Sequence, residues 1–270
     1  MPRGGVASLT DRSNIVESLK KIVGDDWVIT RRGLMEGYLR DETAGPSCPS
    51  PVTDAILVKP ASTEEVSGIL KLANEKGIPV FPRGGGTGLC GGAIPTKPGI
   101  VLSMERMSRI EEIDRRNLMA IVEAGVTLGD FIEAVEKAGL FFPLHPGDEG
   151  AQLGGLIATN AGGSRAVKHG VMRNYVRGIE VVLPTGEVLS LGGKLLKNNT
   201  GYSLMDLVIG SEGTLGVITR AVIKLYPRTK IALTLIIPFT SRHDAVSVVP
   251  KILQSGITPL AIEYVERDLV

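Results

Sequence analysis

The sequence is poor in cysteine, in aromatic residues and in any excess of charge, and each shortage excludes a class of protein. Its 270 residues include two cysteines, Cys48 and Cys90. Two are too few for a disulfide framework, so a reducing compartment, the cytoplasm, is expected. Lysine and arginine number 30 against 29 aspartate and glutamate residues. A nucleic-acid-binding protein normally carries a basic field, so none is expected here. Aromatic residues make up 4% but hydrophobic residues 43%, which is ample for a buried core.

Long apolar runs and metal-ligand clusters are also missing from the sequence. It has no stretch of about 18 apolar residues, so no membrane span is expected. Residues 1–10 contain no apolar core of a signal peptide. The histidines are His145, His169 and His243, and none belongs to an HExxH motif or to a Cys/His cluster with metal-ligand spacing. The sequence therefore predicts no metal site.

Glycine, in contrast, is abundant and concentrated in a few segments. The densest is Pro82–Gly92, with six glycines in eleven residues. Glycine adopts positive φ without steric cost and lets a ligand approach the backbone closely. Successive amides in such a turn form a concave nest that suits phosphate oxygens. Because the strand-like residues 78–81 come directly before it, we interpret this segment as a phosphate-binding loop; the alternative is a flexible surface loop.

A dinucleotide fingerprint is the competing interpretation of this loop. Residues 86–91 match the pattern G-x-G-x-x-G, but that fingerprint requires a helix to begin at the loop. Here Pro95 and Pro98 follow, and then a strand-like run at 100–102. A Walker A loop is absent, because Lys194 is followed by Leu195 rather than by a hydroxyl residue. The sequence therefore favours a loop whose main-chain amides bind phosphate over a helix N-terminus that binds phosphate.

Two further glycine-rich segments, 147–163 and 209–219, and the motif Lys197-Asn198-Asn199-Thr200-Gly201-Tyr202 follow in order. Together these segments resemble the FAD-binding segments of the PCMH-type flavoproteins of the vanillyl-alcohol oxidase superfamily. The resemblance covers about residues 36–227 and is strongest to the flavin subunit of glycolate oxidase and to D-lactate and D-2-hydroxyglutarate dehydrogenases.

This resemblance implies FAD as the cofactor and a two-lobed α+β FAD-binding domain at 36–227, with lobes of about 36–105 and 106–227. Residues 1–35 are expected to form a helical segment, and residues 228–270 an incomplete start of a substrate cap. The implied cofactor-binding residues are Pro82, Arg83, Gly84, Gly85, Gly86, Thr87, Gly88, Leu89, Gly92, Pro146, Gly147, Gly154, Gly155, Ala158, Thr159, Asn160, Gly162, Gly163, Gly170, Glu212, Gly216, Val217 and Ile218.

Some of these residues allow a more specific prediction. Arg83 has two interpretations: it adds positive charge to the site that binds the diphosphate, or it is a solvated surface arginine. Thr87 stands where several branches of the superfamily carry a histidine bonded covalently to the flavin, so FAD is expected to bind non-covalently. Asn160 offers a donor and an acceptor to the cofactor or begins an Asx turn. Glu212 is expected to brace its loop through backbone donors.

Main-chain groups, rather than side chains, are expected to contact the flavin at Val217 and Ile218, whose side chains belong to a strand core. His145 and His169 flank the second glycine-rich segment and are candidates for the flavin site; the alternative is solvated loop histidines. No catalytic residue is assigned, because the family's catalytic and metal-binding histidines lie in a C-terminal region that has no matching motif here.

The resemblance implies oxidation of a small D-2-hydroxy acid, of the D-lactate or glycolate type, to a 2-oxo acid. A base would remove the hydroxyl proton while the Cα hydrogen passes as hydride to flavin N5. Electrons would then pass to an acceptor, and an iron–sulfur partner subunit is one candidate. Two alternatives stay open: a non-catalytic flavin-binding subunit completed by a partner, and an NADPH-fed flavin reductase, against which the 197–202 motif counts.

Local patterns also predict helices and strands. Ser62 and Glu65 indicate a helix start, Thr127 with Asp130 another, and Gly77 and Gly139 the corresponding ends. Pro250 is expected to kink or split the last helix. The expected helices are 13–23, 62–77, 127–139 and 241–254, and the expected strands are 55–58, 78–81, 100–102, 119–123, 179–183, 187–191, 217–225, 231–237 and 260–264.

Overall fold

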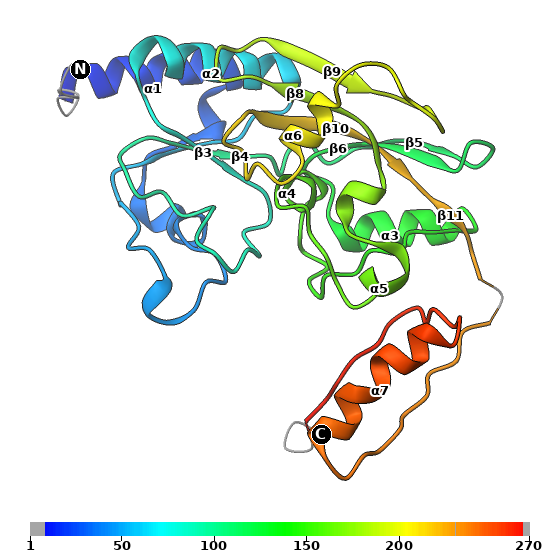
Figure 1. Cartoon of the computed structure of the whole chain (residues 1–270). Helices are drawn as coiled ribbons and strands as arrows, with labels where there is room; N and C mark the ends of the chain where they lie inside the picture. Colours follow the sequence, from blue (N-terminus) through cyan, green and yellow to red (C-terminus); the bar gives the residue numbers. More distant parts are fainter. Residues whose placement is uncertain (1–8, 230, 267–270) are drawn as a thin grey trace.

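The computed structural model describes residues 9–229 and 231–266 and is built on two main β-sheets, with a C-terminal helix that stands apart from them (Figure 1). The first sheet has the order β1-β2-β4-β3, in which β2, β4 and β3 are parallel and β1 is antiparallel. Its strands are β1 (Val28–Ile29), β2 (Ile56–Val58), β3 (Val80–Arg83) and β4 (Ile100–Ser103). Every residue of β2 and β4 is buried, as is typical of central parallel strands.

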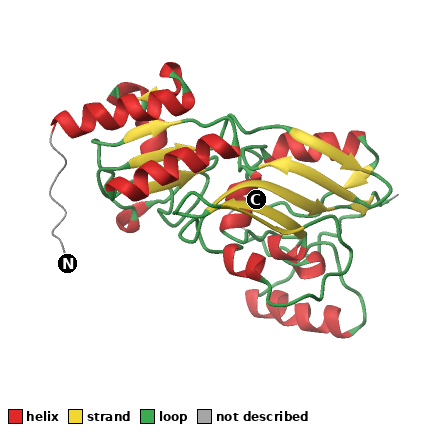
Figure 2. Cartoon of the chain, turned by 90° about the horizontal axis from the view of Figure 1, so that it is seen from above, coloured by secondary structure: helices red, strands yellow, loops and turns green. Residues whose placement is uncertain are grey.

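Two helices, α1 (Leu9–Val23) and α2 (Thr63–Lys76), lie side by side on one face of this sheet (Figures 1 and 2). The predicted ends of α2 are confirmed: the Ser62 side chain accepts a hydrogen bond from the Glu65 amide, and Gly77 ends the helix with a φ of 64°. The Glu65 carboxylate accepts from the Ala61 amide rather than from Ser62.

The opposite face of the first sheet is covered by short 3-10 helices. Met35 and Leu39 pack there against Leu57 and Val101. The 3-10 helices of this part of the chain are η1 (Asp25–Trp27), η2 (Arg32–Leu34), η3 (Glu36–Leu39) and η4 (Gly45–Ser47). This packing brings the chain around η3 to the carboxyl ends of the parallel strands, where the first glycine-rich loop begins.

The second sheet is antiparallel, with the order β5-β6-β10-β8-β9. Its strands are β5 (Ile110–Asp114), β6 (Met119–Glu123), β8 (Val176–Val182), β9 (Val188–Gly192) and β10 (Val217–Lys224). A small sheet pairs β7 (Leu140–Phe141) with β11 (Tyr226–Pro227). The two main sheets and their helices form an α+β fold, as expected.

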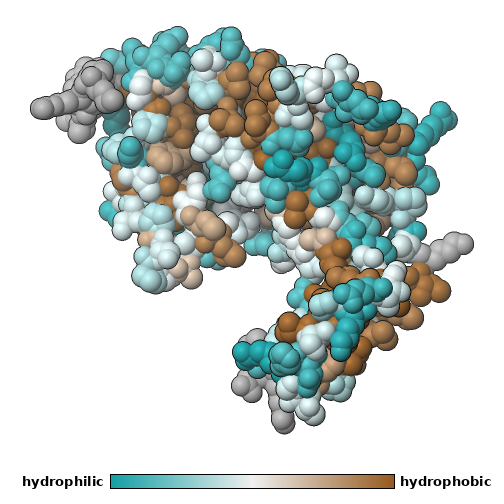
Figure 3. Space-filling view, in the orientation of Figure 1, coloured by the Kyte–Doolittle hydropathy of each residue, from teal (hydrophilic) through white to brown (hydrophobic). Residues whose placement is uncertain are grey.

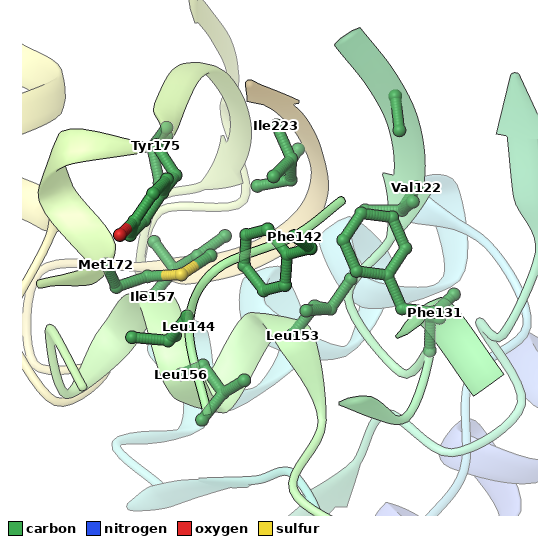
Figure 4. Packing of buried hydrophobic residues seen from close by; sticks show 14 of the residues in the cluster. Val122, Phe131, Phe142, Leu144, Leu153, Leu156, Ile157, Met172, Tyr175 and Ile223 are labelled. Carbon is green, nitrogen blue, oxygen red and sulfur yellow. The ribbon is translucent and has the colours of Figure 1, made fainter. Parts of the chain in front are cut away.

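Helices cover one face of the second sheet and close the larger core (Figure 4). Phe142 lies at its centre, edge-on to Phe131 and to Tyr175 at 5.1 and 5.4 Å between ring centroids. The helices around this sheet are α3 (Leu128–Lys137), α4 (Leu153–Ala158), α5 (Ala166–His169), η5 (Met172–Asn174) and α6 (Leu204–Val208). The predicted start of α3 is confirmed, since Thr127 accepts from the Asp130 amide.

The C-terminal part departs from the predictions. Residues 231–237 and 260–264 were predicted as strands but belong to no strand, because no strand of the described residues pairs with them. Between them α7 (Arg242–Gln254) begins at Ser241, which accepts from the Asp244 amide, and it is not split at Pro250. Loss of one amide donor leaves the other helical hydrogen bonds in place. None of the described helices is long and apolar enough to cross a membrane.

Candidate cofactor site

The three glycine-rich segments meet although they lie far apart in the sequence. A Cβ atom added at Gly85 would collide with the carbonyl oxygen of Gly150, so the first and second segments touch backbone to backbone. A Cβ at Gly213 would lie 3.1 Å from Cγ of Pro82, which joins the third segment to the first. The fold therefore gathers all three where the two sheets meet.

Hydrogen bonds join the third segment to the second. The amide of Gly210 donates to the carbonyl oxygen of Ile157 at 3.2 Å, and the amide of Glu212 donates to that of Ala158 at 2.8 Å. Glu212 has a φ of 53°, which turns the chain at this contact. The α4 segment thus lies between the other two and fixes their spacing.

The first loop keeps most of its amides free of the protein. Within the described chain, Gly91 supplies the one main-chain amide of residues 84–92 that donates to a protein acceptor, the hydroxyl of Thr43 at 2.6 Å. Gly86 and Gly91 each have a φ of 74°. No helix begins between 84 and 99, in agreement with the loop-nest interpretation. Such a loop can present its remaining N–H groups to an anionic ligand.

The other predicted cofactor residues surround this junction. Their positions are the end of β3 (Pro82, Arg83), the following loop (Gly84, Gly85, Gly86, Thr87, Gly88, Leu89, Gly92), the chain before α4 (Pro146, Gly147), α4 and its end (Gly154, Gly155, Ala158, Thr159, Asn160), the next turn (Gly162, Gly163), the turn before β10 (Glu212, Gly216) and the start of β10 (Val217, Ile218). Gly170 ends α5, against the side chain of Asn174 rather than against the first loop.

Close packing explains some of these glycines. A Cβ at Gly154 would lie 2.6 Å from Cβ of Ala124, and one at Gly216 would lie 2.7 Å from Cγ2 of Val181. Both distances are too short for real carbon contacts, so glycine is required by the fold at these two positions whether or not a ligand binds there.

Arg83 is not a solvated surface arginine, because 7% of it is exposed. Its guanidinium donates to the carbonyl oxygens of Arg40 at 2.5 Å and of Gly37 at 2.9 Å, and it lies beneath Gly86. Burial lowers the pKa of Arg83, and the negative charge of Asp41 opposes that effect. The arginine therefore ties the first loop to the η3 segment.

Asn160 and Glu212 serve their loops in different ways. Asn160 has a φ of 49°, and its Oδ1 accepts from the amide of Arg173 at 2.9 Å. Glu212 braces its turn through its own amide, not through its carboxylate, which lies instead beside Gly92. The expected carboxylate bracing is therefore replaced by a backbone contact.

Within the part of the chain that the structure describes, the first residues of β10 pair along one main-chain edge only. Val217 and Ile218 pair with β8, whereas the register with β6 begins at Arg220. Their side chains are buried, 4% and 6% exposed. Main-chain groups on the β6 side of these two residues are thus available next to the second segment.

The histidines near the second segment have protein partners. His145 Nε2 lies 3.5 Å from a carboxylate oxygen of Glu149. His169 packs edge-on against Phe141 and Tyr226. Its pKa is lowered by burial and by the nearby positive charges of Lys168, Arg165 and Lys224. His169 is therefore part of an aromatic cluster and not a solvated loop residue.

Comparison with known proteins identifies the family of the chain and the cofactor of that family. The FAD binding domain family matches residues 55–192, slightly more than half of the chain. The chain belongs to this family. It is a PCMH-type FAD-binding flavoprotein, and its cofactor is FAD.

The flavoprotein has several similar relatives. D-lactate dehydrogenase of Archaeoglobus fulgidus is 51% identical over 235 residues, which cover 87% of this chain and 53% of that protein. Glycolate oxidase subunit GlcD of Bacillus subtilis is 43% identical over 215 residues, covering 79% and 46%. The chain spans about half the length of these relatives.

Solved structures share its fold. Alkyldihydroxyacetonephosphate synthase superposes with a TM-score of 0.75 at 25% identity, covering 92% of this chain and 46% of that one. A 4-ethylphenol oxidase from Gulosibacter chungangensis gives 0.69 at 26% identity, covering 83% and 44%.

Orphaned polar atoms test whether the junction fits FAD. In the described residues, three buried side-chain oxygens around the glycine-rich segments lack a hydrogen-bond partner: Oδ2 of Asp41, Oε1 of Gln152 and Oγ of Ser211. Buried polar atoms are nearly always paired. A ligand with both phosphate oxygens and hydroxyl or N–H donors would satisfy the free loop amides and these oxygens, and FAD carries all of these groups. The residues fit the cofactor.

The sequence pattern did not indicate these three residues or Thr43. Asp41 and Thr43 precede the first loop by more than a full βαβ unit, and a lone polar residue in a loop carries no periodic signal. Gln152 and Ser211 lie inside glycine-rich segments, where the glycines dominate the pattern. Their positions beside the site follow from the tertiary fold alone.

Proposed function

We propose that the chain is the FAD-binding part of an oxidoreductase that oxidises D-2-hydroxy acids, of the D-lactate or glycolate type, to 2-oxo acids. The observation that carries this proposal is its sequence identity to proteins named D-lactate dehydrogenase and glycolate oxidase subunit. The lobes of about 36–105 and 106–227 would hold the cofactor between them.

The residues of this chain bind and orient the cofactor. The free amides of the first loop would hold the diphosphate, and the main-chain edge at Val217 and Ile218 would face the ring system. Thr87 cannot form the covalent link of a histidine, so the cofactor would be released by acid precipitation. When bound, FAD supplies the two-electron acceptor for the oxidation. No catalytic base is assigned within the chain.

Reduction of the bound flavin in the absence of oxygen tests the proposal. D-lactate and glycolate are added separately to the purified yellow protein, with L-lactate as the matched control, and the visible flavin absorbance is followed. Bleaching by a D-2-hydroxy acid, but not by L-lactate, supports the proposal. Bleaching by NADPH alone would instead indicate a flavin reductase.

A second candidate is a non-catalytic flavin-binding subunit that a partner chain completes. It is favoured by the similarity to a protein named as a glycolate oxidase subunit. The partner, an iron–sulfur protein or another electron acceptor, would then take part in turnover. In this case the isolated chain binds FAD, and neither the hydroxy acids nor NADPH bleach it.

A further inference from the structure

A segment outside the three glycine-rich ones is bound tightly to the first loop. Residues 36–43, which comprise η3 and the chain after it, contact the loop through main-chain and side-chain hydrogen bonds. These run from Arg83 to the carbonyl oxygens of Gly37 and Arg40, from the Glu42 amide to the Gly88 carbonyl at 3.0 Å, and from the Gly91 amide to the Thr43 hydroxyl. The segment therefore forms one wall of the cofactor site.

Asp41 occupies the middle of this wall, and one of its oxygens has no partner. Oδ1 accepts from the amide of Thr43 at 3.0 Å. Oδ2 is buried and unpaired among the described residues. It lies 3.9 Å from the position that a Cβ atom would take at Gly88, so it faces the first loop. A buried carboxylate oxygen left unpaired is costly, which indicates a partner supplied from outside the chain.

We propose that Asp41 is a further FAD-binding residue, whose Oδ2 accepts a hydrogen bond from a hydroxyl or N–H group of the bound cofactor. Segment 36–43 is then a fourth binding segment beside the three glycine-rich ones. The inference rests on the FAD site itself and does not depend on which substrate the enzyme oxidises.

The chemistry of the carboxylate restricts which part of FAD it can contact. An ionised carboxylate only accepts hydrogen bonds, and phosphate oxygens also only accept. Two such anions repel each other, so the diphosphate is excluded as the partner of Asp41. The remaining donors are the sugar hydroxyls, the adenine amine and the ring N–H of the flavin. Arg83, at the end of β3, lies close enough for its positive charge to interact with Asp41.

Asp41→Asn tests this proposal, because asparagine retains an oxygen for the Thr43 amide but replaces the second acceptor with an amide donor. Glu42→Gln is the matched control: it removes the same charge from the exposed neighbouring residue and leaves the backbone bond to Gly88. Dissociation constants are measured by titrating the flavin-free full chain with FAD and following flavin fluorescence. Titrations with FMN, followed by fluorescence, and with ADP, followed by calorimetry because ADP contains no flavin, report on the two halves of the cofactor.

We expect Asp41→Asn to weaken FAD binding by about tenfold or more, as for loss of a hydrogen bond to a charged group, and Glu42→Gln to change it by less than about twofold. The same loss of affinity is expected for FMN or for ADP, depending on which of them carries the group that donates to Asp41. Equal affinities of the parent and Asp41→Asn, or an equal loss in Glu42→Gln, would overturn the proposal.

Thermal unfolding of the flavin-free variants separates binding from folding. An Asp41→Asn chain that melts like the parent but binds FAD weakly supports the inference, whereas a lower melting temperature with unchanged affinity refutes it. A parent chain that does not bind FAD also refutes it. Because no turnover is measured, a failure of the hydroxy-acid proposal leaves this result unaffected.

Discussion

At the scale of single residues, the site depends on positions where any side chain would separate two segments. Gly85 is such a position: its φ is outside the left-handed region, so backbone strain plays no part, yet a Cβ would strike the Gly150 carbonyl. The second segment would have to move away from the first, and with it the orphaned oxygen of Gln152. Contact between backbones, rather than loop flexibility, is what requires glycine here.

Gly85→Ala is therefore expected to weaken FAD binding by about tenfold, since forcing one methyl group into a packed contact costs about 1–3 kcal/mol. Fluorescence titration of the flavin-free chain measures the effect. Gly33→Ala is the control, because Gly33 has no atom within 4 Å of the added methyl group. Equal affinities in the two variants would contradict this view of the junction.

At the scale of elements, predictions succeeded where a short contact decides the structure. Ser62, Thr127 and Ser241 each accept a hydrogen bond from an amide three residues later, and all three helix starts were predicted. Strand β5 was missed, because Ile-Glu-Glu-Ile-Asp has few apolar positions and gains its partner from β6. The run at 231–237 is almost entirely apolar, as in a buried strand, but a strand also needs a neighbour, which no local pattern reveals.

The position of η3 depends on a side-chain network at the carboxyl ends of the first sheet. Lys59 Nζ donates to Tyr38 Oη at 2.7 Å and to Glu105 Oε1 at 2.6 Å, and Tyr38 Oη donates to Glu105 Oε2 at 2.8 Å. Burial alone would raise the pKa of Glu105, but the bonds from Lys59, Tyr38 and Ser103 outweigh it and lower the pKa below the ordinary 4.5. The network thus links Tyr38 of η3 to the ends of β2 and β4.

Glu105→Gln is expected to lower the free energy of unfolding at pH 7 by about 1–2 kcal/mol, a value reduced for partial exposure of the carboxylate. A carboxylate whose pKa is lowered by folding stabilises the protein at pH values above its ordinary pKa. This stabilisation is lost as the pH falls below that value. The difference in free energy of unfolding between the parent and Glu105→Gln should therefore shrink as the pH is lowered from about 5 to about 3, a range around the ordinary pKa of glutamate. Urea unfolding at a series of pH values measures this difference. Glu75→Gln, on the exposed face of α2, is the control; a pH-independent difference would disprove this role of the network.

At the scale of the whole molecule, local sequence patterns predict the site, like the fold, only where the feature is encoded within one segment. The three glycine-rich segments could be predicted because each carries its function in a local pattern. The contact of the first segment with the chain around Asp41, made through Arg83, could not be predicted, since it is produced by the packing of η3 across the first sheet. The chain after β11 presents the opposite case: its apolar pattern is clear, but its partner is not in the described fold.

This C-terminal part exposes a large apolar surface (Figure 3). Leu233, Leu235 and Ile236 are 87%, 80% and 91% exposed, on a run of chain that pairs with no strand of the described residues. Exposed apolar patches and unpaired extended chain both favour association. We expect the isolated chain to self-associate through residues 231–266, with a sedimentation coefficient that rises with protein concentration.

A double substitution, Leu233→Ser with Leu235→Ser, is expected to keep the chain monomeric over the same concentrations without changing its FAD content, because these residues lie outside the cofactor site. Leu196→Ser is the matched control: Leu196 is 77% exposed, but it lies in the loop after β9. If Leu196→Ser abolished association equally well, general surface hydrophobicity would be the cause. If the parent were monomeric at every concentration, the exposed segment would not drive self-association, and its apolar pattern would serve another contact.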